Sequence, residues 1–399
     1  MKRRAFFQAL VLCLLLAGSW ILLLISLRSG PGDEETPARD VHEEAATEAA
    51  PTPPPETTSP GASDTVPASP EVPGPWQDWV DRLDALSSPA EMRVELGSLR
   101  EELFSLPPEE AIARLVTFLE SGFDKPTGLA FQVGPDGALL GAASLRALLL
   151  DWLGQLDPAL AADWARSELL ADGTGLVPDV FVIHLRNYEW GSPAPESERQ
   201  AFLEDRFGEL LDHEPWMQNP TTALAEAMDV AVHTRATRFV PDLTALMEPE
   251  KPALLRRAAA LGVEKLVDRE PVQALSELLR EADRPTALPK ARAGYFARLD
   301  PTLGEAPDIL DPYLSAPGVS REEAVFFLRS FPNLNQSFSH NLLSSNNVMT
   351  SGEEIRARLL GALDHLRRWR DDPAMDDLRE ALDAEAARIR RQLGEGFPP

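Results

Sequence analysis

Apolar residues recur along most of the chain with the 3.6-residue period of an α-helix. Spacings of three, four and seven positions place such side chains on one face of a helix. The stretches with the most regular spacing are Trp76, Trp79, Val80, Leu83 and Leu86; Ile355, Leu359, Leu363, Leu366 and Trp369; and Met375, Leu378, Leu382, Ile389 and Leu393. The pattern predicts an all-α domain over residues 76–399.

Alternation with a period of two is rare in this sequence. The best strand candidate is Leu129-Ala130-Phe131-Gln132-Val133, which Gly134-Pro135-Asp136-Gly137 follows. Strand-forming residues followed by a Gly/Pro/Asp turn favour a small hairpin within the helical domain.

Proline is periodic in the second half of the chain. Pro241, Pro271, Pro301 and Pro332 lie 30, 30 and 31 residues apart, and each precedes an apolar run. Proline suits the first turn of a helix, where its missing N–H would have no partner anyway. We therefore expect each of these prolines to begin a helix, with another helix before it. A period of about 30 residues is typical of a stacked array of helical units.

Some prolines follow an Asp that could cap the next helix, and an Arg lies in two of those helices. These are Asp157-Pro158 with Arg166, Asp300-Pro301, and Asp372-Pro373 with Arg379. The pattern resembles that of HEAT-like α-helical repeat proteins over about residues 139–393. The resemblance implies a helical-hairpin array, or α-solenoid, with a scaffold or binding role. An irregular helical bundle is the alternative architecture.

The N-terminus contains a long uncharged apolar segment. Residues 5–27 span roughly 34 Å as a helix, enough to cross a hydrocarbon core of about 30 Å. Three basic residues, Lys2, Arg3 and Arg4, precede this segment. By the positive-inside bias, residues 1–4 form a cytoplasmic stub and the chain after Leu27 is exported.

A cleaved signal peptide is the alternative. Its apolar region would be shorter, about 7–15 residues, and would end at a small-residue cleavage site. The exit from the apolar segment, residues 25–30, is a poor cleavage site, and the residues before Cys13 make a poor lipobox. We therefore interpret residues 5–27 as a transmembrane signal anchor.

Residues 28–75 form a linker between this segment and the helical domain. They contain 11 Pro among Glu, Ala, Thr and Ser, with almost no large apolar side chain. Such a composition cannot bury enough surface to offset chain entropy. We expect a disordered, semi-stiff tether that holds the domain away from the bilayer.

The net charge and the Cys content of the chain exclude some classes of function. The sequence has 64 Asp and Glu against 38 Lys and Arg, a net charge of −26, with a single Cys. Nucleic-acid binding needs a basic face, so no nucleic-acid partner is expected. One Cys excludes an intrachain disulfide and a thiolate metal cluster. Only five bases are Lys, and this richness in Arg, Ala and Pro favours a GC-rich bacterial genome over salt adaptation. The expected location is a bacterial inner membrane, with the domain facing the periplasm or the extracellular side.

Catalytic and metal motifs are weak. The six His residues show no i, i+3 or i, i+4 pair, so a zinc site would need ligands distant in sequence. No Gly-rich phosphate loop opens a helix, and no Gly-x-Ser-x-Gly elbow occurs. The sequence predicts no metal and no cofactor.

Residues 330–351 are unusually rich in uncharged polar side chains. Amides and hydroxyls provide directional hydrogen bonds without charge. One interpretation is a solvated loop between helices, and the other is a recognition surface for peptide or glycan. The candidate binding residues are Asn333, Asn335, Gln336, Ser339, His340 and Asn341.

These features predict an envelope scaffold or adaptor that binds another envelope protein. The alternative, from a different class, is an envelope enzyme that acts on cell-wall or glycan material with paired carboxylates. Two converging carboxylates, one with a raised pKa, would favour the enzyme. An open helical surface without such a pair would favour the binding protein.

Overall fold

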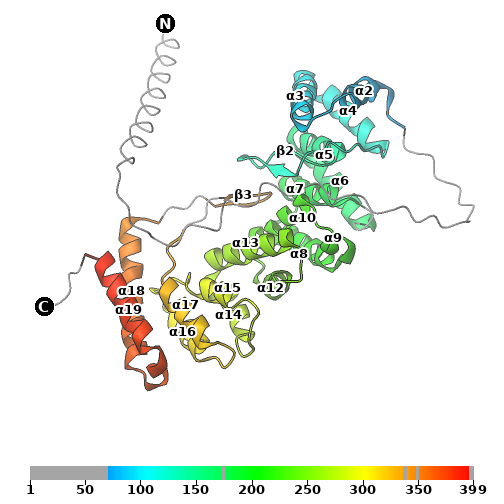
Figure 1. The fold of residues 1–399 in the computed structure, drawn as a ribbon. Coiled ribbons are helices and arrows are strands. Elements are labelled where there is room, and N and C mark those ends of the chain that lie inside the picture. The colour runs from blue at the N-terminus through cyan, green and yellow to red at the C-terminus, as the bar shows by residue number, and fades with distance from the viewer. Residues whose placement is uncertain (1–70, 173–175, 336–338, 347–349, 395–399) are drawn as a thin grey trace, which may run out of the picture. The chain divides into compact units, whose positions relative to one another are not determined.

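The computed structural model describes residues 71–172, 176–335, 339–346 and 350–394, which are mostly helical. Figure 1 shows these helices in chain order, with two short β-hairpins among them. The all-α prediction is confirmed for this part of the chain.

The predicted N-terminal segments fall largely outside this range. The stub at 1–4, the anchor at 5–27 and the linker as far as residue 70 lie outside the described residues. Within the described residues, no helix is both long enough and apolar enough to cross a membrane.

The described chain begins with helices that pack around two tryptophans. Trp76 and Trp79 are buried, and the Trp76 ring lies 4.9 Å from that of Phe118. The Trp76 Nε1–H donates to the Arg114 carbonyl at 3.1 Å, which satisfies the indole inside the core. The elements are η1 (Gly74–Trp76), α2 (Gln77–Asp84), α3 (Pro89–Ser105) and α4 (Pro108–Glu120).

The predicted first hairpin is present. Strand β1 (Gln132–Val133) pairs antiparallel with β2 (Leu139–Gly141). Gly137 turns the chain with a φ of +80°, and a Cβ there would lie 2.9 Å from the Trp190 ring, so only Gly fits. Four helices follow: α5 (Leu145–Leu156), α6 (Pro158–Asp172), α7 (Pro178–Gly191) and α8 (Glu196–Asp212).

Short helices and a long helical pair form the middle of the described chain. Helix α13 (Ala253–Arg269) contacts α10, α11, α12, α14 and α15, so it is central to this region. The remaining elements here are α9 (Glu214–Gln218), α10 (Thr222–Ala227), α11 (Asp229–His233), η3 (Thr237–Phe239), α12 (Val240–Leu246) and α14 (Pro271–Arg280).

The C-terminal part combines helices with a second hairpin that the sequence did not predict. Strand β3 (Ser339–His340) pairs antiparallel with β4 (Ser345–Asn346), inside the polar segment. The other elements are α15 (Pro289–Phe296), α16 (Ala306–Ser315), α17 (Arg321–Ser330), α18 (Gly352–Asp371), η4 (Pro373–Leu378) and α19 (Arg379–Gln392). The last predicted amphipathic stretch is thus divided, because the backbone leaves helical geometry at Met375.

Several prolines begin helices as predicted. Pro158 and Pro271 are first residues of α6 and α14, and Pro241 lies in the first turn of α12. The Asp157 carboxylate accepts from the Leu160 N–H at 3.0 Å and so caps α6. The single residues Asp157 and Glu270 join α5 to α6 and α13 to α14, which gives two tight helical hairpins.

The same prediction is wrong at Pro301 and Pro332. The Asp300 carboxylate accepts from the Thr302 N–H at 2.9 Å and holds a turn, so the next helix begins only at Ala306. Pro332 follows the end of α17, and residues 332–335 are not helical. The polar segment therefore begins at the last residue of α17, and its other described residues, as far as Ser351, lie outside any helix.

A buried ion pair connects α5, α7 and the first hairpin. Arg186 pairs with Asp151, and both side chains are 0% exposed. Asp151 also accepts from the Leu139 N–H at 3.3 Å, and Arg186 donates to the Gly137 carbonyl at 3.0 Å. Removing one partner of such a pair leaves an uncompensated buried charge.

Replacing Asp151 by Ala should therefore destabilise the protein by about 3–5 kcal/mol. The matched control is Asp364→Ala, because Asp364 pairs with Arg367 where the side chains are 75% and 67% exposed. That change should alter stability by less than about 1 kcal/mol. Denaturant unfolding of the full-length protein in detergent, followed by circular dichroism, measures both. Equal effects of the two substitutions would contradict the structural role of the buried pair.

Candidate functional site

Residues of helix α13 line two hollows, and Lys265 is a lining residue of both. The first, which we call the socket, has a volume of about 140 Å³ and lies between α13, the α10–α11 segment and the second hairpin. Its lining includes Glu226, Met228, Asp229, Leu254, Arg257, Leu261, Lys265 and Asn341. The second, which we call the cleft, has a volume of about 290 Å³. Its lining includes Lys265, Asp268, Arg269, Arg298, Asp300, Asn333, Asn335, Ser345 and Arg358.

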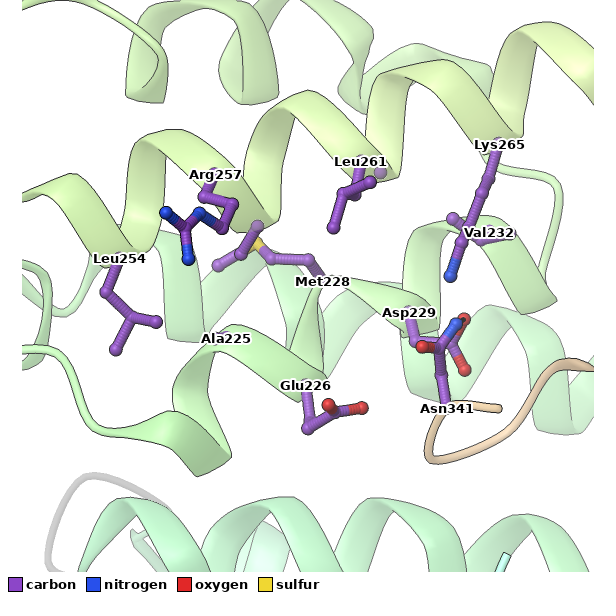
Figure 2. Close-up of a pocket in the computed structure, with 12 residues that line it drawn as sticks. Ala225, Glu226, Met228, Asp229, Val232, Leu254, Arg257, Leu261, Lys265 and Asn341 are labelled. Atoms are coloured by element: carbon purple, nitrogen blue, oxygen red, sulfur yellow. Dashed lines mark hydrogen bonds between the residues drawn. The ribbon is translucent and has the colours of Figure 1, made fainter. Parts of the chain in front are cut away.

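The socket has an apolar wall and a charged end. Figure 2 shows Leu254, Leu261 and Lys265 on α13, facing the segment that carries Glu226 and Asp229. Leu261 is 46% exposed although it is a large apolar residue. A volume this small suits one side chain, since small-molecule sites usually hold about 300–1,000 Å³.

Asp229 fixes the tip of the second hairpin against the socket. Its carboxylate accepts from the Leu343 N–H at 2.8 Å and from the Ser344 N–H at 2.7 Å. It also accepts from the Ser344 hydroxyl and from the Asn341 amide, the latter at 3.3 Å. These four donors satisfy most of its acceptor capacity, so Asp229 is a structural anchor.

Glu226 is the carboxylate of the socket that holds a proton near neutral pH. Burial, and then the nearby Asp229 charge, raise the pKa of Glu226 from 4.5 to about 7, although Lys265 and the Leu342 N–H act in the opposite direction. Glu226 can therefore donate a hydrogen bond at pH values where an ordinary carboxylate cannot.

Lys265 is a nearly buried cation. It is 7% exposed and forms neither a hydrogen bond nor an ion pair with any residue that the structure describes. Burial lowers its pKa, and the charges of Asp229 and Glu226 only partly oppose this effect. The side chain is largely buried but lines both hollows, so a ligand group in either hollow could bond its ammonium.

The cleft is cationic in a strongly acidic protein. Four bases and two acids line it, whereas the whole chain carries −26. Arg298 is neutralised by Asp268, at 2.7 Å, and by Glu264, at 3.1 Å. Arg358 pairs with Asp300 at 3.0 Å. The excess positive charge of the cleft therefore comes from the other two bases.

Arg269 is the second of these bases. Its guanidinium donates to the carbonyls of Val232, at 3.3 Å, and Ser345, at 3.4 Å. It forms no ion pair with a carboxylate in the described part of the chain. Arg269 and Lys265 stand four residues apart on α13, so they lie on the same face of the helix.

The structure separates the candidate binding residues of the polar segment. Asn333 and Asn335 line the cleft, and Asn341 lines the socket, where its amide is bonded to Asp229. Ser339 and His340 form β3, and His340 is not among the residues that line the two hollows. Gln336 lies outside the described residues. The binding role of these residues stays a prediction.

A larger hollow of about 410 Å³ lies elsewhere, between α12, α14 and α15. Its buried polar groups are already bonded within the protein. The Tyr295 hydroxyl donates to the Ala260 carbonyl at 3.2 Å, and Arg292 pairs with Glu323 at 2.7 Å. The socket and the cleft differ because a buried cation between them lacks such a partner.

Comparison with known proteins assigns no function to this site. No protein-family model, no curated protein and no solved structure matches the chain. In the described residues, no group of three or more His, Cys, Asp or Glu side chains could hold a metal ion.

Replacing Glu226 by Gln tests the protonation of the socket. The folded state holds the Glu226 proton more tightly than the unfolded chain does, because the pKa rises from 4.5 to about 7 on folding. The resulting stability is fully present below the unfolded pKa and is lost as the pH rises through the folded pKa. Relative to Glu226→Gln, the wild type should lose up to about 3 kcal/mol of unfolding free energy between about pH 5 and pH 8.

Denaturant unfolding at several pH values measures this difference. The control is Glu101→Gln on the exposed face of α3, which should follow the wild type at every pH. Parallel pH profiles for wild type and Glu226→Gln would show that Glu226 has an ordinary carboxyl pKa.

Proposed function

We propose that this chain is a membrane-anchored, exported scaffold or adaptor of the bacterial cell envelope. Its helical domain, a HEAT-like repeat array, would bind another envelope protein through the socket and the cleft. Residues 5–27 would anchor it, with the N-terminus cytoplasmic, and the Pro-rich linker would hold the domain away from the bilayer.

The observation that carries this proposal is the surface of α13. Leu261 is 46% exposed at the socket, and the nearly buried Lys265 has no partner within the described residues. An exposed apolar side chain beside desolvated polar groups is typical of a protein interaction site. The tight hairpins α5–α6 and α13–α14 support a repeat array, although the expected 30-residue spacing of helix starts does not continue past Pro271.

The second candidate function is an enzyme that acts on cell-wall or glycan material. Glu226 and Asp229 supply the observation in its favour, since both line the socket and one has a pKa raised to about 7. Asp229, however, is committed to the hairpin by four hydrogen bonds, and the socket is small for a sugar chain. The geometry therefore favours the binding function.

Capture of a partner tests the proposal. Full-length protein purified from solubilised membranes should bring down an envelope protein, and Leu261→Asp should reduce that capture about tenfold or more, because it places a charge in the apolar wall. The matched control is Leu360→Asp, since Leu360 is 40% exposed on α18 and is not a lining residue of the socket or the cleft. Equal capture by both variants, at unchanged melting temperatures, would contradict binding at the socket.

Topology is tested separately. A reporter enzyme that is active only outside the cytoplasm, fused after Pro399, should be active. The mature protein should retain its N-terminal apolar segment, as mass spectrometry of the purified protein can establish. Cleavage near residue 30, or an inactive reporter, would contradict the signal anchor.

A further inference from the structure

Two bases of α13 line the cleft without a carboxylate partner, and they define what the cleft can accept. Lys265 and Arg269 form no ion pair with any described residue, whereas Arg298 and Arg358 are each neutralised. Like charges four residues apart on a helix weaken it by about 0.2–0.5 kcal/mol, so this pair does not serve the stability of α13. An anionic group placed between these bases would gain two charge-assisted hydrogen bonds.

The nearby acids do not replace such a group. Asp229 already accepts four hydrogen bonds from the second hairpin. The pKa of Glu226 is raised to about 7, so near neutral pH this carboxyl group supplies only part of a negative charge to Lys265. Asp268 and Asp300 are paired with Arg298 and Arg358.

The socket adds a second requirement, which is an apolar side chain on the ligand. Its apolar wall includes Leu261, which lies one helical turn before Lys265 on the same helix. At 1.5 Å per residue, the Cα atoms of Leu261 and Lys265 are about 6 Å apart along the axis, and those of Leu261 and Arg269 about 12 Å. An extended peptide rises about 3.3 Å per residue, so these intervals correspond to two to four residues.

We infer that the socket and the cleft together bind an extended acidic peptide segment of the partner. The carboxylate of an Asp or Glu lies between Lys265 and Arg269, and an apolar side chain two to four residues away fills the socket beside Leu261. The amides of Asn333 and Asn335 line the cleft and can bond the peptide backbone. This inference rests on the proposed function and specifies the chemistry of its partner.

A peptide fits these observations better than a sugar or a phosphate. A charged sugar or a phosphate could pair with Lys265 and Arg269, but it carries no apolar side chain for the socket. The overall charge of −26 does not prevent the binding of an acidic segment. Repulsion from distant exposed acids is screened beyond a Debye length of about 8 Å at physiological ionic strength, whereas the two bases are in direct contact with the ligand.

Binding to a peptide array tests the inference. The probe is the full-length protein in detergent, and the array holds short Gly/Ser peptides with one Leu and one Glu at separations of one to six residues. We expect the strongest binding at separations of two to four. Replacing Glu by Gln, or Leu by Ser, in the peptide should each weaken binding about tenfold or more. Binding that does not depend on the Glu, the Leu or their separation would overturn the inference.

The protein variants are Lys265→Met and Arg269→Gln, with Lys290→Met as the control. Lys290 is an exposed lysine of α15 that is not a lining residue of either hollow. Lys265→Met keeps an apolar stem of similar length and removes an unpaired buried charge. It should therefore abolish peptide binding while the melting temperature stays equal or rises, and Arg269→Gln should weaken binding about tenfold or more. The control should bind as the wild type does.

The remaining outcomes separate the two proposals. If Lys265→Met lowers the melting temperature and still binds the peptides, Lys265 is a structural cation and the inference is overturned. Displacement of the bound peptide by inorganic phosphate or by an oligoglucuronate at equal charge concentration would also overturn it. If the wild type captures its partner and Lys265→Met captures it equally, the inference fails while the proposed function stands. If the wild type captures no partner and binds no peptide, both fail.

Discussion

The carboxylate of Asp229 is the constraint on which the candidate site depends. It accepts from two backbone N–H groups, one hydroxyl and one amide, all from residues 341–344. Because these donors belong to the tip of the second hairpin, the interaction fixes the hairpin beside α13. The hairpin then contributes Asn341 to the socket and Ser345 to the cleft. A single internal anion thus positions a polar wall for both hollows, in a part of the chain that has little regular structure of its own.

The bases around the site differ in whether an acidic side chain neutralises them. Two of the four bases that line the cleft are already paired: Arg298 with Asp268 and Glu264, and Arg358 with Asp300. Lys265 and Arg269 are different because no described carboxylate forms an ion pair with them. In a protein of this net charge, positive groups that lack acidic partners indicate a site better than the abundance of negative groups does.

Much of the fold was predictable from the sequence because residues near one another in the chain determine helices, turns and helix starts. The 3.6-residue period identified α2 and α18, the Gly/Pro turn identified the first hairpin, and prolines marked the starts of α6 and α14. The prediction failed at Pro301 and Pro332, because a proline is also compatible with a turn and with the residues after a helix. Periodicity in sequence records which face of a helix is apolar, and it does not record how far the chain continues before the next helix begins.

The candidate site was predictable only in part. The polar composition of residues 330–351 directed attention to Asn333 and Asn335, which line the cleft. Lys265 was missed because it stands within an amphipathic helix and has no local motif. One signal was available: Leu254, Leu261 and Lys265 follow one another at intervals of seven and four, a second stripe on α13 beside the stripe that faces the core. The bond from Asp229 to Ser344 joins residues 115 positions apart, and no local pattern encodes it.

That separation in sequence also sets the order in which the molecule is assembled. Helical hairpins such as α5–α6 and α13–α14 close over a single connecting residue, so they can form as soon as both helices exist. The second hairpin cannot dock until the chain has been made through Ser344, long after α13 is complete. A chain that ends before this point would contain α13 and its bases, but it would lack Asn341 of the socket and Ser345 of the cleft. The surface that we propose for the partner is therefore complete only when the chain extends through Arg358, the last residue that lines the cleft.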